Sequence, residues 1–154
     1  MIQDGQLLNY IGGKWRSSRT SEFLDVRNPA TAETIAAGDH FFKMKGNELF
    51  KVAVRSMADI SREVLEEAGH SAADVKLFIP HQANQRITDA VSNKLNVNSE
   101  RVYSGIAQHG NTSSASIPIG LDECVEEGRI SEGDLVLMAS FGGGVTWGAV
   151  LMRW

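Results

Sequence analysis

The fold is decided by a stretch near the middle of the chain, "VKLFIPHQANQRI" at residues 75–87. Its first five residues form a short apolar run bounded by turns, which predicts a buried strand. A helix is expected to follow from about Asn84 to Leu95, because Ile87, Val91 and Leu95 recur with helical spacing on one face. A strand that passes directly into a helix is the repeating unit of α/β folds.

The same alternation continues on both sides of this stretch. Upstream, Asn47 is a candidate N-cap for a helix whose apolar residues repeat with helical spacing until Gly69 ends it. Downstream, we expect a strand in "RVYSGI" (101–106), a helix from Ser113 to Glu127, a strand in "DLVLMASF" (134–141) and a returning antiparallel strand in "VTWGAVLMRW" (145–154). This order predicts an α/β protein with a mixed, mostly parallel sheet.

The first forty residues have a different, strand-like pattern. Gly12 and Gly13 separate two short apolar-aromatic segments, which is typical of a two-residue β-hairpin. The segment "FLDV" at residues 23–26 alternates like a strand and is followed by Asn28 and Pro29. The pattern changes near residues 37–41, so we expect an N-terminal β segment at 1–38 and an α/β domain at 39–154.

Composition excludes several classes of function. The chain has 154 residues and a formal net charge of −4, which gives no electrostatic basis for binding nucleic acid or an anionic membrane. Its single cysteine, Cys124, cannot form an intrachain disulfide, which fits a reducing cytoplasm. We find no signal peptide and no apolar run long enough to span a bilayer, so a cytoplasmic location is expected.

Two polar residues follow predicted strands and are candidates for a site. His81 stands directly after the buried strand, and Asn111 lies in the Gly/Ser/Thr-rich turn "HGNTSSAS" at residues 109–116. Sites in open α/β sheets form at such strand ends, where an imidazole N–H and an amide N–H can converge. The alternatives are a packed, hydrogen-bonded histidine and an ordinary turn asparagine. No nucleophile is evident beside them.

Three motifs carry a resemblance to a known family: "PHQANQRI" (80–87), "HGNTSSASIP" with "LDE" (109–118 and 121–123), and "FGGGVTWG" (141–148). In these motifs, residues 41–154 resemble the C-terminal part of β-ketoacyl-acyl-carrier-protein synthase III, an initiating condensing enzyme of fatty-acid synthesis with the thiolase fold. Residues 5–37 resemble the extreme N-terminus of an aldehyde dehydrogenase of the methylmalonate-semialdehyde type. The two resemblances together imply a chimeric chain that contains half of a thiolase-like fold.

The resemblance implies roles for individual residues. His81 and Asn111 would bind the thioester carbonyl of malonyl-acyl-carrier protein and stabilise the enolate that decarboxylation leaves. Gly143 would lend its backbone N–H to an oxyanion hole that Phe141 borders. The alternative for "FGGG" is a tight turn between strands. No metal and no cofactor are implied beyond the thioesters of coenzyme A or carrier protein.

The resemblance also implies contacts with substrates and partners. Asn84 would contact the pantetheine arm, and Lys51 and Arg86 would meet the acidic acyl-carrier protein. Ordinary solvated surface is the alternative for these charges. The helix at 113–127 is apolar around most of its circumference, so we expect a second cover for it and predict a homodimer built helix against helix.

The single cysteine does not qualify as the family's nucleophile. Cys124 lies well inside the predicted helix, where its glutamate neighbours would raise the pKa of the thiol. Two hypotheses follow. The chain is a folded module that cannot condense substrates alone, or it is a residual malonyl-thioester decarboxylase or half-enzyme that a partner carrying the cysteine completes. We also predict that "FLDV" (23–26) or "ETIA" (33–36) adds a substitute strand to the sheet.

Overall fold

The computed structural model describes residues 2–3, 6–7, 9–11, 14–16, 46–143 and 145–154. The chain divides into two compact units, Met1–Lys43 and Met44–Trp154. Each unit is considered by itself.

The first unit contains two small antiparallel pairs. Strand β1 (Ile2–Gln3) pairs with β2 (Gln6–Leu7), and β3 (Asn9–Ile11) pairs with β4 (Lys14–Arg16). In the second pair Ile11 lies opposite Lys14, so two residues connect the strands and the predicted hairpin is confirmed. The pair β1–β2 was not predicted. The segments "FLDV" and "ETIA" lie outside the described residues, so the substitute strand stays a prediction.

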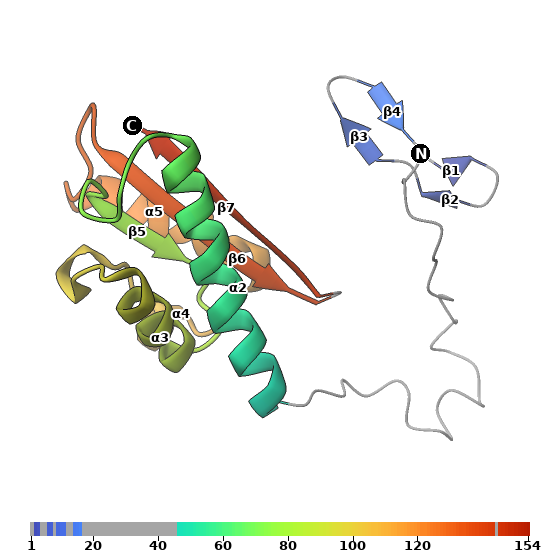
Figure 1. Cartoon of the computed structure of the whole chain (residues 1–154), viewed down its shortest axis with the longest axis horizontal. Helices are drawn as coiled ribbons and strands as arrows, with labels where there is room; N and C mark the ends of the chain where they lie inside the picture. Colours follow the sequence, from blue (N-terminus) through green and yellow to red (C-terminus); the bar gives the residue numbers. More distant parts are fainter. Residues whose placement is uncertain (1, 4–5, 8, 12–13, 17–45, 144) are drawn as a thin grey trace. The chain divides into compact units, whose positions relative to one another are not determined.

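The second unit contains a three-stranded mixed sheet in the order β5-β6-β7 (Figure 1). Strand β5 (Leu77–Pro80) runs parallel to β6 (Leu135–Gly142), and β7 (Thr146–Arg153) returns antiparallel to β6. All four residues of β5 are buried, as expected for a strand that is covered on both faces. The predicted α/β fold and the final antiparallel strand are therefore confirmed.

Helices cover both faces of this sheet (Figure 1). Helices α2 (Gly46–Glu67) and α3 (Gln85–Leu95) share one apolar cluster with Phe78 and Leu137. Helix α5 (Ser116–Glu126) packs through Cys124 against residues that point to the opposite face, among them Leu77, Ile79 and Val136. The alternation along each strand thus separates two cores with the sheet between them. No described helix has both the length and the apolar composition of a membrane-spanning segment.

The three long helices end in the same way. A residue with a left-handed backbone conformation follows each helix within two residues of its end: Gly69 after α2, Asn96 after α3 and Gly128 after α5. At each end two backbone N–H groups return to carbonyls of the last turn, for example His70 to Leu65 and Gly69 to Glu66 after α2. This is the Schellman arrangement, which satisfies carbonyls that would otherwise lack a partner. The predicted stop at Gly69 is confirmed, and Asn84 caps the start of α3.

The predicted strand at residues 101–106 is wrong. A 3-10 helix, η1 (Ser99–Arg101), takes up the first residue, and a short helix, α4 (Ile106–His109), begins at the last. Between them only Val102 bridges to Phe78, and the N–H of Tyr103 donates to the carbonyl of Phe78. The turns on both sides leave too few extended residues for a strand, although the β-rich composition of "RVY" had favoured one.

The predicted helix at 113–127 is split at its start. Residues Ser113–Ala115 form a 3-10 helix, η2, and the α-helical part begins at Ser116. Pro118 lies in the first turn of α5, where a missing N–H costs no intrahelical bond. Gly120, one turn into the helix, lies under the ring of Tyr103, because a Cβ added there would be 2.5 Å from that ring.

We predict that Gly120→Ala destabilises the protein although alanine favours helix by about 1 kcal/mol. Tyr103 is only 4% exposed and its hydroxyl is bonded to Glu123, so the ring cannot move aside without breaking that contact. Overpacking of this kind costs about 1–3 kcal/mol or more, and the net change should be a loss. Chemical denaturation measures it. Gly148→Ala, where a Cβ meets nothing within 4 Å, is the matched control and should unfold near the wild-type midpoint.

Candidate active site

His81 directly follows β5 and continues its pairing with β6. Its backbone N–H donates to the carbonyl of Ala139 at 2.8 Å. The side chain is half-buried, and its Nδ1 lies 2.7 Å from the hydroxyl oxygen of Ser116. Burial lowers the pKa of His81 below its usual value, so the ring is neutral at pH 7. A neutral ring carries one N–H donor, which makes its tautomer important.

Gln82, the next residue, is a buried amide that joins the end of β5 to the loop after η1. Its Nε2 donates to the carbonyl of Pro80 at 2.8 Å and to that of Tyr103 at 3.4 Å. Its Oε1 accepts the backbone N–H of Gly105 at 3.0 Å. Buried polar groups need such partners, so Gln82 fixes the position of the backbone on both sides of His81.

Ser116 is the first residue of α5 and is buried beside His81. Its oxygen accepts the backbone N–H of Gln82 at 3.2 Å, in addition to the contact with His81 Nδ1. The side chain is 3% exposed. One hydroxyl therefore connects the loop after β5 with the start of the helix on the opposite face of the sheet.

Asn111 lies in the turn before α5 and is exposed. Its Oδ1 accepts the backbone N–H of Ser113 at 2.9 Å, and Ser113 adopts a left-handed conformation with φ of 55°. With the oxygen held in this way, the amide Nδ2 is the end of the side chain that can donate to a ligand. The predicted donor group is thus oriented by its own turn.

The structure does not join the two predicted donors to each other. Each has its own partner, Ser116 for His81 and Ser113 for Asn111, and both partners belong to the short segment 113–116. Neither donor lines either of the two described cavities. His81 is half-buried and Asn111 is exposed.

The other predicted site residues are more dispersed. Asn84 is exposed and its Oδ1 accepts the N–H of Arg86 at 2.9 Å, so it has a structural role as the N-cap of α3. Phe141 packs at the edge of the core that α2 and α3 cover. Gly143 lies in the turn between β6 and β7, directly after Gly142, which pairs with Thr146 as the last residue of β6. A Cβ added at Gly143 would meet nothing within 4 Å.

A groove of about 390 Å³ lies along the first half of α2. Lys51 lines it together with Phe50, Arg55 and Lys94, so its apolar floor is surrounded by cations. Arg86 is placed over the ring of Phe50, 5.4 Å from the ring centre, which is a cation–π distance. Phe50 thus brings the two predicted carrier-protein contacts, Lys51 and Arg86, to one region of the surface.

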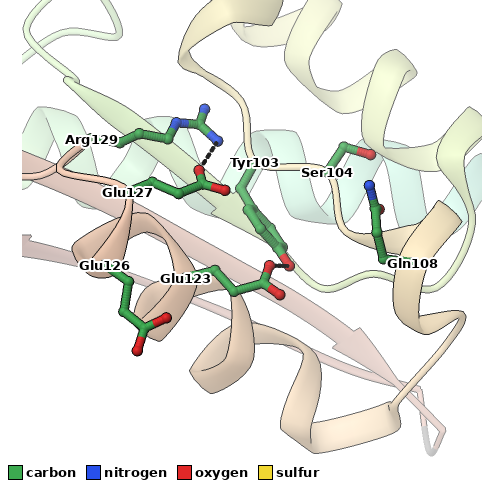
Figure 2. A pocket seen from close by; sticks show the side chains of 7 residues that line it. All are labelled: Tyr103, Ser104, Gln108, Glu123, Glu126, Glu127 and Arg129. Atoms are coloured by element: carbon green, nitrogen blue, oxygen red, sulfur yellow. Dashed lines mark hydrogen bonds and ion pairs between the residues drawn. The ribbon is translucent and has the colours of Figure 1, made fainter.

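A second cavity of about 330 Å³ is acidic (Figure 2). Glu123 accepts the hydroxyl of Tyr103 at 2.6 Å and is 2.6 Å from Nε2 of His109. The hydrogen bond from Tyr103, and then that from His109, holds the pKa of Glu123 below its usual value. Burial and the same bond raise the pKa of Tyr103, so its hydroxyl remains protonated and cannot serve as a base near pH 7. Among the described residues no group of side chains could hold a metal ion.

Cys124 is fully buried in α5. Burial raises the pKa of its thiol, and Glu127 and Glu123 raise it further against the opposing effect of Arg129. A buried, protonated thiol is a poor nucleophile. The sequence-based rejection of Cys124 as a nucleophile thus agrees with its surroundings.

Sequence reasoning missed Gln82 and Ser116. Both stand inside the motifs that were singled out, but the partners that join them to other elements are 21 to 35 residues away in the chain. The sequence did offer one signal, namely small and amide side chains in the motif that places a histidine at the end of a buried strand.

Comparisons with known proteins identify the family to which this chain belongs. The family model for the C-terminal region of 3-oxoacyl-[acyl-carrier-protein] synthase III matches residues 65–154. The β-ketoacyl-[acyl-carrier-protein] synthase III of Aquifex aeolicus is 51% identical over 143 residues, which cover 90% of this chain and 46% of that protein. Its crystal structure superimposes with a TM-score of 0.73 at 57% identity, over 74% of this chain and 37% of that one. The crystal structure of the Thermus thermophilus synthase III superimposes with a TM-score of 0.71 at 50% identity, over 73% of this chain and 35% of that one.

Two further facts follow from these comparisons. The chain spans less than half the length of the relatives it matches. The comparisons find no support for the aldehyde-dehydrogenase resemblance of residues 5–37, and the Aquifex match covers more of the chain than residues 41–154 could supply.

Proposed function

Because this chain belongs to the family of 3-oxoacyl-[acyl-carrier-protein] synthase III C-terminal domains, we propose that His81 and Asn111 bind the thioester oxygen of a malonyl group. The observation that carries the proposal is the shared geometry of the two side chains. Each has one polar atom engaged by the segment 113–116, which leaves Nε2 of His81 and Nδ2 of Asn111 to face a ligand. Two donors that converge on one oxygen would stabilise a negative charge that develops there.

Decarboxylation would use both donors. When the carbon–carboxylate bond of the malonyl group breaks, carbon dioxide leaves and the bonding electrons move into the thioester as an enolate. The negative charge collects on the oxygen that His81 and Asn111 bind. The nucleophilic carbon of the enolate can then attack an acyl group or take up a proton.

Condensation needs an acylated nucleophile as well, and these 154 residues do not supply one. The chain's single cysteine is Cys124, which is buried and has a raised thiol pKa. His81 is half-buried and Asn111 exposed, so water competes for both donors and weakens their effect on the charge. We therefore favour a folded, non-catalytic module over a residual decarboxylase for the isolated chain. Condensation would need a partner that carries the cysteine.

The first test is incubation of the chain with acetyl-CoA, followed by intact mass spectrometry. We expect no acetyl adduct, because without an accessible thiolate no acyl-enzyme forms. Chemical acetylation of surface lysines is recognised by its persistence in Cys124→Ser. A stoichiometric adduct that this substitution abolishes would contradict the proposal.

A second arm of the test uses malonyl-CoA and measures release of acetyl-CoA. We expect no release above that in buffer. Release that is lost in both His81→Ala and Asn111→Ala, and kept in the control His70→Ala, would establish the residual decarboxylase instead.

The cationic groove along α2 supports an acidic partner, and we assign it to acyl-carrier protein. Lys51, Arg55 and Lys94 surround an apolar floor, and Arg86 extends the positive region across Phe50. An acidic protein with an apolar contact face would complement both features, and the charges would mainly raise its association rate.

Charge reversal tests this assignment. Lys51→Glu and Arg86→Glu should each weaken binding of acyl-carrier protein roughly two- to fivefold at low salt, as is typical of exposed ion pairs. The effect should fade as salt is added. Lys76→Glu, an exposed lysine at the other end of β5, is the control. Equal losses for all three variants would mean that only net charge matters.

Exposed apolar side chains support a homodimer. Trp147 and Val150 on β7 are 51% and 56% exposed, and Val125 on α5 is 38% exposed. Ile117, Ile119 and Leu121 of α5 are only half-buried, which supports the predicted second cover of this helix.

Light scattering after size exclusion should report about twice the 16.8 kDa chain mass at micromolar concentration. Val125→Glu on α5 should shift the protein toward monomer, whereas the nearby exposed change Glu126→Gln should not. A monomeric wild-type chain would exclude the homodimer.

A further inference from the structure

The hydroxyl of Ser116 contacts His81 and Gln82, and together these two partners restrict where its proton can be. The backbone N–H of Gln82 is a donor and therefore occupies one lone pair of the serine oxygen. The second partner, His81 Nδ1 at 2.7 Å, can be either a donor or an acceptor, depending on the tautomer of the ring.

Two arrangements are possible. In the first, Ser116 donates its proton to an unprotonated Nδ1, and the ring proton is on Nε2. In the second, Nδ1 carries the proton and donates to Ser116, whose own proton then needs another acceptor. Among the described residues, Nδ1 of His81 is the acceptor within hydrogen-bond distance of the Ser116 hydroxyl, and at 3% exposure the side chain has almost no access to water. The second arrangement would bury an unpaired hydroxyl donor, which is costly.

We propose that Ser116 is a positioning residue that holds His81 in the neutral tautomer with the proton on Nε2. In this form the ring presents an N–H on the side away from the buried serine, where a ligand oxygen can accept it. The consequence for catalysis rests on the proposed function, because it is the malonyl thioester that would use this donor. The tautomer itself is a property of the folded chain and is tested without any substrate.

The position of Ser116 makes this restraint rigid. Its backbone begins α5, which is anchored by fully buried Cys124 in the core beneath the sheet. Gln82, which supplies the other hydrogen bond, is held at both ends of its side chain. The helix and the loop therefore both hold the serine oxygen in place, and this oxygen determines which nitrogen of the imidazole carries the proton.

The direct experiment is nitrogen NMR of the wild-type chain labelled with ¹⁵N-histidine at a pH above the titration of His81. The chain has four histidines, and the His81 signals are those that disappear in His81→Gln. We expect an unprotonated Nδ1 and a protonated Nε2. A proton on Nδ1 would overturn the proposal.

Substitution gives a second readout with a defined sign. A serine that donates to Nδ1 stabilises the neutral ring, so Ser116→Ala should raise the pKa of His81 by about 0.5–1 unit, the shift equivalent to one hydrogen bond. A serine that accepts from Nδ1–H would stabilise the charged ring as well, and its loss would lower the pKa. Burial is what lowers the pKa of His81, so the comparison is made on a ring whose pKa is not set by a neighbouring charge. A lowered or unchanged pKa would overturn the assignment.

Two controls separate positioning from packing. Ser116→Thr keeps the hydroxyl and should keep the wild-type tautomer and pKa, and Ser114→Ala removes an exposed serine of the same segment without effect. Equal changes in Ser116→Ala and Ser116→Thr would attribute the effect to packing and reject the role. If Ser116→Ala does not fold, the wild-type tautomer decides alone. The tautomer and the turnover of malonyl-CoA are independent results. If NMR shows the proton on Nε2 but the chain does not turn over malonyl-CoA, the role of Ser116 is supported whatever the outcome for the proposed function.

Discussion

The whole α/β unit depends on a four-residue strand that is buried on both faces. Leu77 and Ile79 of β5 point into one core and Phe78 into the other, so no peptide group of this strand can reach water. Every N–H and C=O must then find a partner in the protein. Strand β6 supplies hydrogen-bond partners along one edge of β5, and the residues around Val102 supply them along the other edge. These pairings set the direction of both neighbours and place the carboxyl end of β5 beside the start of α5.

The candidate site is a consequence of how that strand ends. Where apolar residues stop at Pro80, the chain is still buried, and its next polar groups must be satisfied inside the protein. Gln82 does this with three hydrogen bonds through its side chain, and Ser116 accepts its backbone N–H. His81 stands between these contacts and is the residue whose ring emerges toward solvent. Its orientation is therefore determined by the requirements of folding before any ligand binds.

The sequence predicted those features of the fold that depend on a local pattern of residues. The periodic apolar residues of α2 and α3, the glycine that ends α2 and the strong strand β6 are all properties of short windows. The strand expected at 101–106 failed because η1 and α4 compete for the same residues, and only the bridge at Val102 survives. His81 and Asn111 were identified from motifs, but their partners were not, because Ser116 is 35 residues from His81 and meets it only through the topology of the sheet. Contacts between elements on opposite faces of a sheet have no periodic signature along the chain.

The same reasoning explains why a donor geometry and a catalytic activity are separate properties here. The bonds that orient His81 also complete the hydrogen bonding of β5, and the bond that orients Asn111 forms the turn into η2, so folding alone preserves both. Stabilisation of an enolate needs in addition a water-excluding environment, in which each donor is worth far more than in bulk solvent. A half-buried imidazole and an exposed amide lack that environment in this chain. The strength of the site therefore depends on what covers the open side of the segment 113–116, and the exposed apolar residues of β7 and α5 are the surfaces where such a cover would gain the most from burial.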